Sequence, residues 1–340
     1  MPRTKADIFG RTLQGLKDAC AVAKLPAFTS EQIVDWLYKK HVRSFARMSN
    51  LAKTAREDMD RDFAIGVVPP ECSSVSSDGA KKYLYRFDDV GSVETAFIPE
   101  ANRGTLCIST QVGCRRACRF CMTGKQGFLG NLTAGQILNQ YEALPDRESV
   151  TNIVYMGMGE PLDNLAPVLN SLEIFTASYG YSLSPRRITV STVGIMPQLR
   201  RFLEATDCNI AISLHSPLPD ERRTLMPVEA SNPILDSLGY LKTQSFQRSR
   251  RVTFEYILFD GINDSERHST ALVRLLHGIR CRVNLIRYNA ATDLEYSASR
   301  KSKEFRENLV RKGLITTIRN SRGADIDAAC GLLSTKIRGE

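Results

Sequence analysis

Residues 106–128 of this 340-residue chain, LCISTQVGCRRACRFCMTGKQGF, hold the pattern that decides its fold. They contain four of the nine cysteines: Cys107 alone, and then Cys114, Cys118 and Cys121 in a C-x3-C-x2-C arrangement. Thiolates are soft ligands, and closely spaced thiolates on a short loop favour an iron–sulfur cluster or zinc. Three such ligands are one short of a closed tetrahedral site, so the fourth ligand must come from elsewhere.

Zinc is the main alternative to a cluster on ligand type alone. A structural zinc site usually combines two CxxC-like pairs, or one such pair with a distant pair of histidines. Here His215, His268 and His277 are scattered along the chain. Spacing therefore favours a three-cysteine cluster with one iron open to an exogenous ligand. A zinc site that recruits Cys107, Cys72 or a histidine is the less favoured reading.

The composition is that of a soluble globular protein with a substantial core. Hydrophobic residues make up 42% of the chain and charged residues 24%, which is ordinary for such proteins. No run of about 18 apolar residues is present, so no membrane span is expected, and the N-terminal sequence MPRTKADIFGRTL has no apolar signal core. Nine cysteines without a secretion signal indicate a reducing compartment. We therefore expect a cytoplasmic protein.

The net charge of +9 is concentrated after residue 100. The first 100 residues carry 15 Lys and Arg against 14 Asp and Glu, a balance of +1, which leaves +8 on residues 101–340. Between Arg300 and Arg322, eight basic residues accompany only Glu304 and Glu307. A basic surface suits a polyanion such as RNA, although charge alone equally allows a solvated helix.

The first 75 residues are expected to form a small helical domain. Apolar residues recur at helical spacing over residues 11–24, and a second helix is expected to begin at a capping box in residues 29–32. A third helix is expected from residue 51 towards residue 63. Pro69, Pro70 and the serine-rich sequence after them break this pattern, so a linker is predicted there.

Strands are predicted after residue 75. Residues 76–100 are expected to form a linker and a β-hairpin, with strands at 82–87 and 93–98. From residue 101 onward strands and helices alternate, which predicts parallel strands with right-handed crossovers. Residues 101–340 are thus predicted to form a partial (β/α)6 barrel, similar to a TIM barrel. Its strands are expected at residues 105–110, 150–156, 187–191, 209–214, 252–258 and 282–286, and its helices at 132–144, 167–177, 197–203, 233–244, 266–276 and 301–312.

Polar and glycine-rich segments follow these predicted strands. The cysteine loop follows the first strand, and residues 157–161 (GMGEP) follow the second. Ser191 ends the third strand, residues 213–215 (SLH) end the fourth, and Asn289 follows the sixth. The carboxyl ends of parallel barrel strands meet at one face, where barrels of this type hold their active sites. We therefore expect these residues to line one site.

The cysteine loop and the GMGEP turn are similar to the corresponding motifs of radical S-adenosylmethionine (SAM) enzymes. The resemblance implies a 4Fe-4S cluster on Cys114, Cys118 and Cys121, whose open iron is chelated by the amino and carboxylate groups of SAM. An electron from the cluster then cleaves SAM to a 5′-deoxyadenosyl radical. The glycines of the second motif would let backbone groups approach the SAM amine closely.

Further motifs resemble the RlmN/Cfr family of radical SAM enzymes, which methylate adenosine in RNA. They occur in order between about residues 94 and 333 and read GTLCISTQVGC, FCMTGKQGF, MGMGEPL, SLSPRRITVSTVG, ISLHSP, RRTLMPV, VNLIRYN and GADIDAACG. The helical N-terminus is similar to the accessory RNA-binding domain of that family. The resemblance implies that residues 101–340 are the catalytic core, which ends in a segment with a catalytic cysteine.

The family resemblance implies a detour through a cysteine, because an aromatic carbon of adenine is too weak a nucleophile to attack SAM. Cys330 would be methylated first, and the radical would abstract hydrogen from its S-methyl group so that the methylene radical adds to adenine. Glu94 would remove the ring proton, and Cys107 would attack Cys330 to release the product with a transient disulfide. Each methylation would use two SAM molecules. Without the resemblance, both cysteines are ordinary small buried residues and Glu94 is an exposed strand residue.

Seven residues match family positions around SAM. Hydroxyl and amide groups at strand ends are suited to hydrogen bonds with its nucleoside, ribose and carboxylate. The seven residues are Gly159, Glu160, Ser191, Ser213, Leu214, His215 and Asn289. Arg115, Arg116 and Arg119 crowd the cluster loop in a way that lies outside the family pattern. They either raise the cluster potential, meet RNA phosphates or are simply exposed.

We therefore expect a methyltransferase that forms 2-methyladenosine in 23S ribosomal RNA, at the peptidyl-transferase centre, and at position 37 of transfer RNA. One alternative is Cfr-type methylation at carbon 8, which confers antibiotic resistance, and another is a zinc-stabilised RNA-binding protein without catalysis. TGKQGF favours carbon 2, whereas SLSPRR, SLHSP and NLIRYN are closer to the carbon-8 enzymes. We also expect a flavodoxin-like external electron donor, no membrane partner and a monomeric protein.

Overall fold

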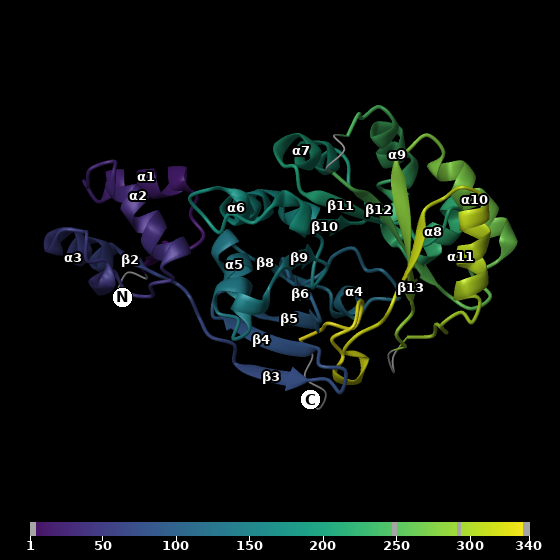
Figure 1. The fold of residues 1–340 in the computed structure, drawn as a ribbon, viewed down its shortest axis with the longest axis horizontal. Helices are drawn as coiled ribbons and strands as arrows, with labels where there is room; N and C mark the ends of the chain where they lie inside the picture. Colours follow the sequence, from purple (N-terminus) through teal and green to yellow (C-terminus); the bar gives the residue numbers. More distant parts are fainter. Residues whose placement is uncertain (1–4, 247–249, 291–293, 336–340) are drawn as a thin grey trace.

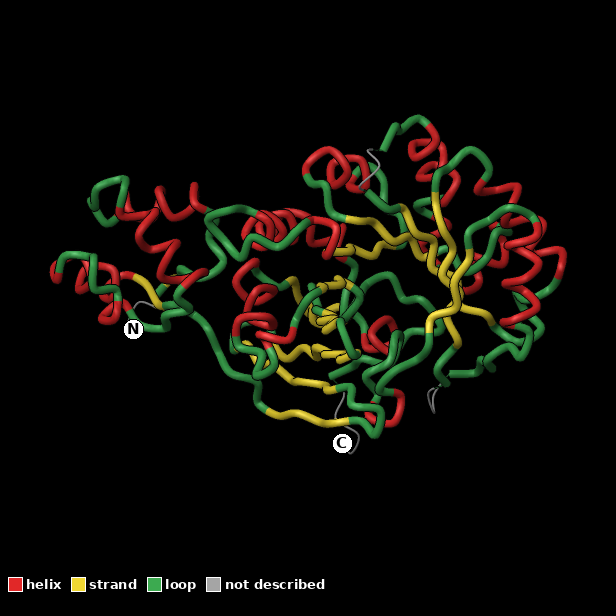
Figure 2. Tube along the Cα trace, viewed as in Figure 1, coloured by secondary structure: helices red, strands yellow, loops and turns green. Residues whose placement is uncertain are grey.

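The structure is a computed structural model that describes residues 5–246, 250–290 and 294–335. Figure 1 shows an elongated molecule in which a small group of helices at the N-terminal end lies beside a larger body built around one sheet. Helices pack along the outer side of this sheet, as Figure 2 shows. None of the described helices is long and apolar enough to cross a membrane.

The N-terminal part is helical, as expected, but its second helix does not begin with the predicted capping box. The N-cap is Phe28, which makes no side-chain cap, and Ser30 Oγ instead donates to the Ala27 carbonyl at 2.7 Å. A short parallel strand pair, which the sequence does not predict, joins the two ends of this part. The elements are β1 (Ala6–Asp7), α1 (Leu13–Val22), α2 (Thr29–Val34), η1 (Asp35–Lys39), η2 (Phe45–Arg47), α3 (Lys53–Asp62) and β2 (Phe63–Ala64).

One ten-stranded sheet forms the body of the molecule, in the order β14-β13-β12-β11-β10-β9-β6-β5-β4-β3. Seven consecutive strands of this order, from β14 to β6, are parallel to their neighbours. Six of them are the strands of the predicted partial (β/α)6 barrel, which is confirmed. Strand β12 is buried along its whole length, as parallel strands covered by helices usually are. The six strands are β6 (Arg103–Cys107), β9 (Asn152–Tyr155), β10 (Ile188–Thr192), β11 (Asn209–Ser213), β12 (Val252–Leu258) and β13 (Cys281–Arg287).

The predicted helices between these strands are also present. The first begins after Thr133, whose hydroxyl accepts from the Gln136 N–H at 3.2 Å in a capping box. One further helix, α8 (Pro219–Leu225), is too short and polar to show an apolar period in the sequence. The predicted helices are α5 (Ala134–Glu142), α6 (Leu165–Thr176), α7 (Gln198–Ala205), α9 (Ile234–Lys242), α10 (Glu266–Leu276) and α11 (Ser302–Arg311).

Both ends of the sheet extend beyond the six predicted barrel strands. The expected hairpin forms β4 (Lys81–Phe87) and β5 (Gly91–Glu100), and β5 pairs antiparallel with β6. Part of the serine-rich segment, expected as a linker, is instead strand β3 (Cys72–Val75) on β4. Its pairing uses backbone groups, so no apolar pattern announces it. At the other end β14 (Thr316–Arg319) pairs with β13.

A short antiparallel ribbon carries the three-cysteine loop. Strand β7 (Gln111–Gly113) pairs with β8 (Phe128–Asn131), and α4 (Met122–Gln126) lies between them. Gly113 has a φ of +70°, and a Cβ there would lie 1.6 Å from the Gly127 carbonyl oxygen. Only glycine fits this approach, so the ribbon fixes where the cysteine loop begins and ends.

Polar contacts tie the C-terminal segment to the turn between β3 and β4, and we call them the C-terminal latch. Asp325 accepts hydrogen bonds from the hydroxyl groups of Ser76 and Ser77. Asp78 accepts one from the Gly323 N–H at 2.9 Å. After the latch the segment runs back towards α4, as Figure 1 shows. Residues 331–335 are thereby brought to the cysteine loop.

Gly10→Ala should loosen the contact between the N-terminal helices and α5. Gly10 has a φ of +88°, and a Cβ there would lie 2.2 Å from the backbone nitrogen of Gly135. An alanine requires both a strained backbone and a separation of the two segments, so about 2 kcal/mol or more of unfolding free energy should be lost. Denaturant unfolding measures this loss.

Gly15→Ala is the matched control for that substitution. Gly15 lies inside α1, and an added Cβ would meet its nearest neighbour, the Arg11 Cβ, at an ordinary 3.4 Å. Alanine in a helix interior is favoured over glycine by about 0.5–1 kcal/mol, so this variant should be slightly more stable. An equal loss in both variants would contradict the close contact at Gly10.

Candidate active site

The three cysteines of the C-x3-C-x2-C pattern lie on one tight loop between β7 and β8. The Cys114 N–H donates to the Gly127 carbonyl at 3.0 Å, and the Cys121 N–H donates to the Cys118 carbonyl at 3.1 Å. Cys121 is also the N-cap of α4. Backbone hydrogen bonds therefore fix the loop, and the cysteine side chains remain available as ligands.

The thiols of this loop fit an iron–sulfur cluster. Burial raises the pKa of all three, to about 12 for Cys114, and neighbouring sulfurs add to the shift, so the three lie close together. Buried thiolates need a positive centre, which the irons of a cluster supply. Among the described residues, no three or more His, Cys, Asp or Glu side chains are placed to hold a single metal ion. Ligands of a cluster bind separate irons and are spaced more widely than that.

Gly157 and Gly159 of the second motif make room for the protein's own chain. A Cβ on Gly157 would lie 2.6 Å from Ser109 Oγ, and one on Gly159, at φ +97°, would lie 2.6 Å from Gln111 Cβ. The two glycines let the turn after β9 pack against the segment between β6 and β7. Chain packing thus requires glycine at both positions, and the expected approach of SAM to this turn stays a prediction.

Glu160 is buried and braces two loops. One carboxylate oxygen accepts from the Leu162 N–H at 3.0 Å, and the other accepts from the Val193 N–H at 2.9 Å. Burial raises the pKa of Glu160 to about 7, although these hydrogen bonds oppose the shift. Glu160 joins the turn after β9 to the end of β10, so it sets the spacing of two predicted SAM-binding segments.

His215 follows β11 in the left-handed backbone region, at φ +57°. Its Nδ1 accepts from the Ile257 N–H at 3.0 Å, and burial, with the charge of Arg222, lowers its pKa to about 3. The ring is therefore neutral near pH 7 and carries its proton on Nε2. Its edge-to-face contact with Phe120, at 4.8 Å between ring centroids, ties β11 to the cluster loop.

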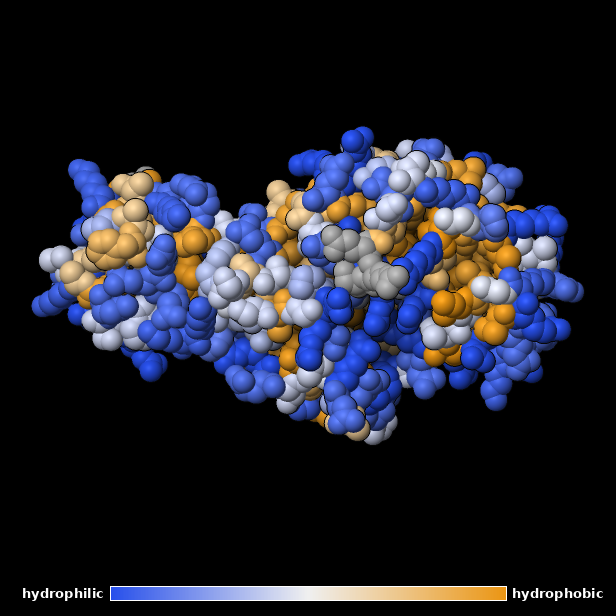
Figure 3. All heavy atoms as spheres, turned by 45° about the horizontal axis from the view of Figure 1, so that its top comes forward, coloured by the Kyte–Doolittle hydropathy of each residue, from blue (hydrophilic) through white to orange (hydrophobic). Residues whose placement is uncertain are grey.

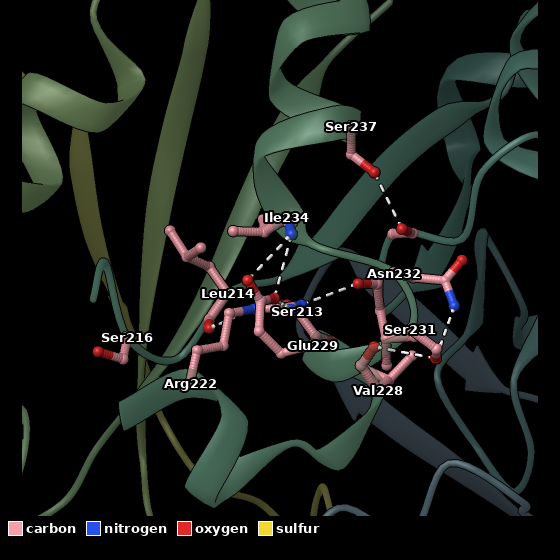
Figure 4. A network of polar contacts seen from close by, with 12 residues as sticks. Ser213, Leu214, Ser216, Arg222, Val228, Glu229, Ser231, Asn232, Ile234 and Ser237 are labelled. Carbon is pink, nitrogen blue, oxygen red and sulfur yellow. Dashed lines mark hydrogen bonds and ion pairs between the residues drawn. The ribbon is translucent and has the colours of Figure 1, made fainter. Parts of the chain in front are cut away.

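Arg222 is a fully buried charge that the sequence does not predict as part of the site. From α8 it donates to the carbonyls of Leu214 at 3.2 Å, Ser213 at 3.0 Å and Val193 at 2.9 Å. Its guanidinium also forms an ion pair with Glu229, and Figure 4 shows these groups converging below α9. Arg222 therefore holds the carboxyl ends of β10 and β11 together.

The positive charge of Arg222 also reaches the cluster loop. Arg222 lowers the pKa of Cys118, although burial raises that pKa overall, so the two groups are close. A nearby cation stabilises thiolate ligands and the cluster they hold. The sequence RRTLMPV gives no sign of which arginine is buried, Arg222 or its neighbour Arg223, whose side chain is 55% exposed. Only the tertiary packing of α8 distinguishes the two.

Ser191 and Asn289 lie at the expected strand ends. Ser191 is half-buried on β10. Asn289 Nδ2 donates to the Cys330 carbonyl at 3.4 Å, and its Oδ1 accepts from the Ser321 hydroxyl. A predicted SAM-binding residue therefore contacts the predicted methyl carrier.

Cys330 lies between the cluster loop and Cys107. The Gly331 carbonyl accepts a 2.8 Å hydrogen bond from the first residue of α4, and Ala328 packs with Cys107 in a small apolar cluster. The Cys330 sulfur contributes to the raised pKa of both Cys107 and Cys121, where burial is the main cause. The structure thus brings together the two cysteines that the family resemblance pairs.

Arg319, on the unpredicted strand β14, adds a positive charge beside these sulfurs. Burial raises the pKa of Cys107 to about 12, and the charge of Arg319 opposes that shift. The Cys330 sulfur in turn raises the pKa of Arg319, and Arg319 Nη1 lies 3.3 Å from Met156 Sδ. A guanidinium here favours the thiolate form of a nearby cysteine. Arg319 is predictable from the sequence only if β14 is predicted, and the four residues of β14 show no apolar period.

Glu94 lies on β5 and is buried. Without the family resemblance, the sequence predicts an exposed strand residue at this position. Lys82 Nζ lies 2.8 Å from one of its carboxylate oxygens, and the Ser334 N–H donates to the other at 2.8 Å. Burial raises the pKa of Glu94, and Lys82 opposes the shift. A carboxylate with a raised pKa beside the C-terminal segment is able to take up a proton there.

The arginines of the cluster loop are engaged with protein groups. Arg116 Nε donates to Asp163 at 2.8 Å within an ion pair, which ties the loop to the turn after β9. The Arg115 guanidinium lies 4.2 Å from the centre of the Phe128 ring. Arg119 donates its backbone N–H to the last carbonyl of α8 at 3.0 Å. These contacts give the loop structural support from three sides.

Comparison with known proteins agrees with this fold and site. Residues 108–273 match the family model of the radical SAM superfamily, and residues 6–65 match the ribosomal RNA large subunit methyltransferase N-terminal domain. The chain is 36% identical to a radical SAM methyltransferase of known structure from Sphaerobacter thermophilus. The two superpose with a TM-score of 0.89, over 96% of this chain and 99% of that one. The fold and the site therefore define a radical SAM enzyme, a class that uses a 4Fe-4S cluster and SAM.

Two relatives identify the family more closely. A probable dual-specificity RNA methyltransferase RlmN from Parabacteroides distasonis is 51% identical over 97% of each chain. A dual-specificity RNA methyltransferase RlmN from Halorhodospira halophila is 40% identical over 92% of this chain and 88% of that one. The chain belongs to the RlmN family.

Arg222→Leu should destabilise the protein strongly. The substitution leaves Glu229 buried without its partner, and breaking a buried ion pair in this way costs about 3–5 kcal/mol of unfolding free energy. Denaturant unfolding measures the loss. In the double variant Arg222→Leu/Glu229→Leu neither charge remains, so part of the stability should return.

Arg223→Leu is the control, because it removes the same charge from the exposed neighbour on α8. It should change the unfolding free energy by less than about 0.5 kcal/mol. A double variant less stable than Arg222→Leu alone would show that the unpaired charge of Glu229 is not the source of the loss.

Proposed function

We propose that this protein methylates carbon 2 of adenosine in 23S ribosomal RNA, at the peptidyl-transferase centre, and at position 37 of transfer RNA. The observation that carries the proposal is the position of Cys330, whose sulfur neighbours both Cys121 of the cluster loop and the buried Cys107. The relatives' name, dual-specificity RNA methyltransferase, supports the substrate class. It favours this function over carbon-8 methylation and over a zinc-stabilised RNA-binding protein.

The cofactors are held at the carboxyl ends of the strands. Cys114, Cys118 and Cys121 bind the 4Fe-4S cluster, which with two SAM molecules per turnover supplies one methyl group and one carbon-centred radical. Glu160 acts by bracing the loops, and the neutral His215 offers its Nε2–H as a donor. The residues proposed to hold SAM are Gly159, Glu160, Ser191, Ser213, Leu214, His215 and Asn289.

Cys330 carries the methyl group to the base, and Cys107 releases the product. The Arg319 guanidinium lies near the Cys330 sulfur, which raises the pKa of Arg319. Once the carbon is joined to adenine, the Cys107 thiolate attacks the Cys330 sulfur and the sulfur–carbon bond breaks. The electron pair of that bond passes to the carbon, which takes up a proton, and a disulfide forms. Two electrons from an external donor restore both thiols.

Addition of the methylene radical leaves one unpaired electron on the adduct, and a bound cluster would take this electron back. Glu94 removes the ring proton from the carbon under attack. It lies on β5 beside the C-terminal segment, held there by Ser334 and Lys82. Its raised pKa gives the carboxylate a greater affinity for a proton than an exposed glutamate has. The ion pair with Lys82 keeps part of the population ionised and ready to accept that proton.

The setting of the reaction completes the proposal. We infer a cytoplasmic monomer that receives electrons from a flavodoxin-like donor. Residues 1–75 serve as the accessory RNA-binding domain, residues 76–100 connect it as linker and hairpin, and residues 101–340 form the radical SAM core. The match of residues 6–65 to a ribosomal RNA methyltransferase domain supports the first assignment, and the net charge of +9 suits an RNA partner.

Product analysis tests the function directly. The protein is reconstituted with iron and sulfide without oxygen, incubated with SAM, a reductant and RNA, and the nucleosides are separated by mass spectrometry. The expected product is 2-methyladenosine, from both RNA types. Formation of 8-methyladenosine alone would contradict the carbon-2 assignment. A colourless zinc protein without broad absorption near 400 nm would contradict the proposal that the protein is a radical SAM enzyme.

Cys107→Ala should trap a covalent adduct between Cys330 and RNA. The variant can still methylate Cys330 and join the carbon to adenine, but it lacks the thiolate that breaks the sulfur–carbon bond. The adduct is detected as a shifted, nuclease-sensitive band, and its mass places it on the C-terminal peptide. Cys208→Ala, which removes another buried cysteine, is the control and should form no adduct. Free methylated RNA at the normal rate from Cys107→Ala would contradict this assignment.

Glu94→Gln should slow product release by about 10²–10⁴-fold, the usual contribution of a positioned base. Glu94 must be ionised to accept the proton, and its pKa is raised. In the unmodified protein, the rate should therefore fall as pH decreases through a value above the ordinary carboxyl range. Single-turnover rates measured against pH should show this limb and should lose it in Glu94→Gln. Lys82→Met should move the limb to higher pH, and an unmoved limb in both variants would rule Glu94 out.

A further inference from the structure

A cavity of about 520 Å³ runs inside the barrel from Cys330 to the amino ends of the strands. One end is lined by Cys107, Met156 and Cys330, at or beyond the carboxyl ends of the strands. The other end is lined by four arginines, each within two residues of the first residue of β6, β10, β12 or β13. They are Arg103, Arg186, Arg251 and Arg282. A volume of this size is in the range of small-molecule sites.

The wall of this cavity is polar along its length. The interior of a closed barrel of this type is usually filled by layers of valine, isoleucine and leucine. Here the strands present seven hydroxyl and amide side chains to the cavity, beside the apolar Ile98, Val154, Ile286 and Ile318. The seven polar residues are Thr105, Asn152, Thr189, Asn209, Thr253, Asn284 and Thr317. Such a wall hydrogen-bonds a polar ligand rather than packing as a core.

The carboxyl end of the barrel is covered by the C-terminal segment and the cluster loop. Thr123 Oγ1 donates to the Leu333 carbonyl at 2.6 Å, and Gln126 Nε2 donates to the Thr335 hydroxyl at 2.6 Å. The residues proposed to hold SAM occupy the same end. With the carboxyl end occupied in this way, the opening at the amino end, where the arginines lie, offers a second, larger ligand a route to Cys330.

Asn209, at the start of β11, holds two of these arginines in place. Its Nδ2 donates to the Arg186 carbonyl at 2.9 Å, and its Oδ1 accepts from the Arg251 N–H at 3.0 Å. Within residues 5–246, 250–290 and 294–335, Arg186, Arg251 and Arg282 form no ion pair with a carboxylate. Anchored backbones with unneutralised guanidinium groups are what an anion site requires.

The charge around the opening is strongly positive. Glu100 is the single carboxylate among the described residues that line the cavity, and it lies opposite Arg103 in the ladder between β5 and β6. Figure 3 shows strongly hydrophilic side chains gathered across the middle of the body of the molecule. Four arginines against one carboxylate suit a ligand that carries several negative charges, such as a run of phosphates.

We propose that a single-stranded segment of the RNA substrate enters the barrel through its amino end. Backbone phosphates bind Arg186, Arg251 and Arg282, and the target adenine lies in the cavity beside Cys330. The proposal rests on the proposed function, which makes RNA the substrate. A guanidinium binds phosphate through two parallel hydrogen bonds, and the threonines and asparagines offer partners to the base edge and the 2′-hydroxyl. A duplex is too wide for this cavity, so the target base must be unpaired.

Alanine substitutions at the opening test the access route. Arg186→Ala, Arg251→Ala and Arg282→Ala should each weaken the binding of a single-stranded RNA oligonucleotide by about tenfold. Each lost phosphate contact should also reduce the slope of log affinity against log salt by about 0.7. Fluorescence titration of a labelled oligonucleotide at several salt concentrations gives both quantities. Arg267→Ala, on the exposed surface of α10, removes the same charge and should change neither.

Iron content and absorbance near 400 nm show whether each variant still holds its cluster. If an alanine variant loses its cluster, the lysine variant at the same position tests the access route instead, because lysine keeps the positive charge at the opening. Lysine variants should bind RNA within about threefold of the unmodified protein, since a point charge still contacts phosphate. The proposal would be overturned if the lysine variants bound RNA as weakly as the alanine variants. Unchanged affinity and salt slope in the triple alanine variant, or an equal loss in Arg267→Ala, would overturn it as well.

The outcomes separate this proposal from the function on which it rests. If the unmodified protein binds RNA with the expected salt slope but forms no 2-methyladenosine, the function fails and the access route stands. If the triple alanine variant forms 2-methyladenosine with an unchanged KM for RNA, the function stands. In that case RNA reaches Cys330 by another surface, such as the basic helix α11.

Discussion

The hydrogen bond between the Met122 N–H and the Gly331 carbonyl, at 2.8 Å, is the contact on which the arrangement of the site depends. It joins the start of α4, directly after the cluster cysteines, to the residue that follows Cys330. As a result the Cys330 sulfur lies near both the cluster loop and Cys107 at the end of β6. A single backbone hydrogen bond contributes only about 1 kcal/mol. The further contacts of α4 with the C-terminal segment, and the latch before it, therefore share the task of holding Cys330 in place.

Buried charges, rather than the sheet itself, set the spacing of the loops above the barrel. The parallel strands bring their carboxyl ends to one edge, but the loops after them would be free to drift. Glu160 joins the turn after β9 to the end of β10, and Arg222 joins the ends of β10 and β11. Each satisfies several backbone groups at once, and each loses them all if its side chain is removed. The same two residues lie close to the cluster cysteines, so loop spacing and cluster surroundings are set together.

The sequence predicts the elements whose pattern is local. The barrel strands are short apolar runs, and α10 is found over the expected residues because its apolar face repeats over three turns. Strands β3, β7, β8 and β14 are short and partly polar, and they exist because a neighbouring strand offers backbone partners. No local pattern announces them. The capping box at residues 29–32 fails for the opposite reason, since a correct local signal is overridden when Ser30 bonds to the preceding turn.

The same division applies to the site. The three-cysteine cluster site is predicted from spacing, whereas the pairing of Cys107 with Cys330 is implied only by the family resemblance, because the contact joins distant parts of the chain. Arg222 and Arg319 lie on elements that the sequence does not predict, so their burial beside the sulfurs is visible only in the fold. The burial of Glu94 likewise depends on the C-terminal segment packing over β5. Chemistry that depends on long-range packing is thus the part that a pattern of residues leaves out.

The C-terminal latch gives the reactive end of the chain a stability of its own. Asp325 and Ser77 lie at the exposed surface, where water competes for the same hydrogen bonds. Breaking the latch leaves every strand pair of the sheet intact, so the segment opens as a separate cooperative unit at a lower free energy than the barrel. In the proposed reaction the methyl carrier Cys330 therefore lies on a tether whose release is a local event, which leaves every strand of the barrel in place.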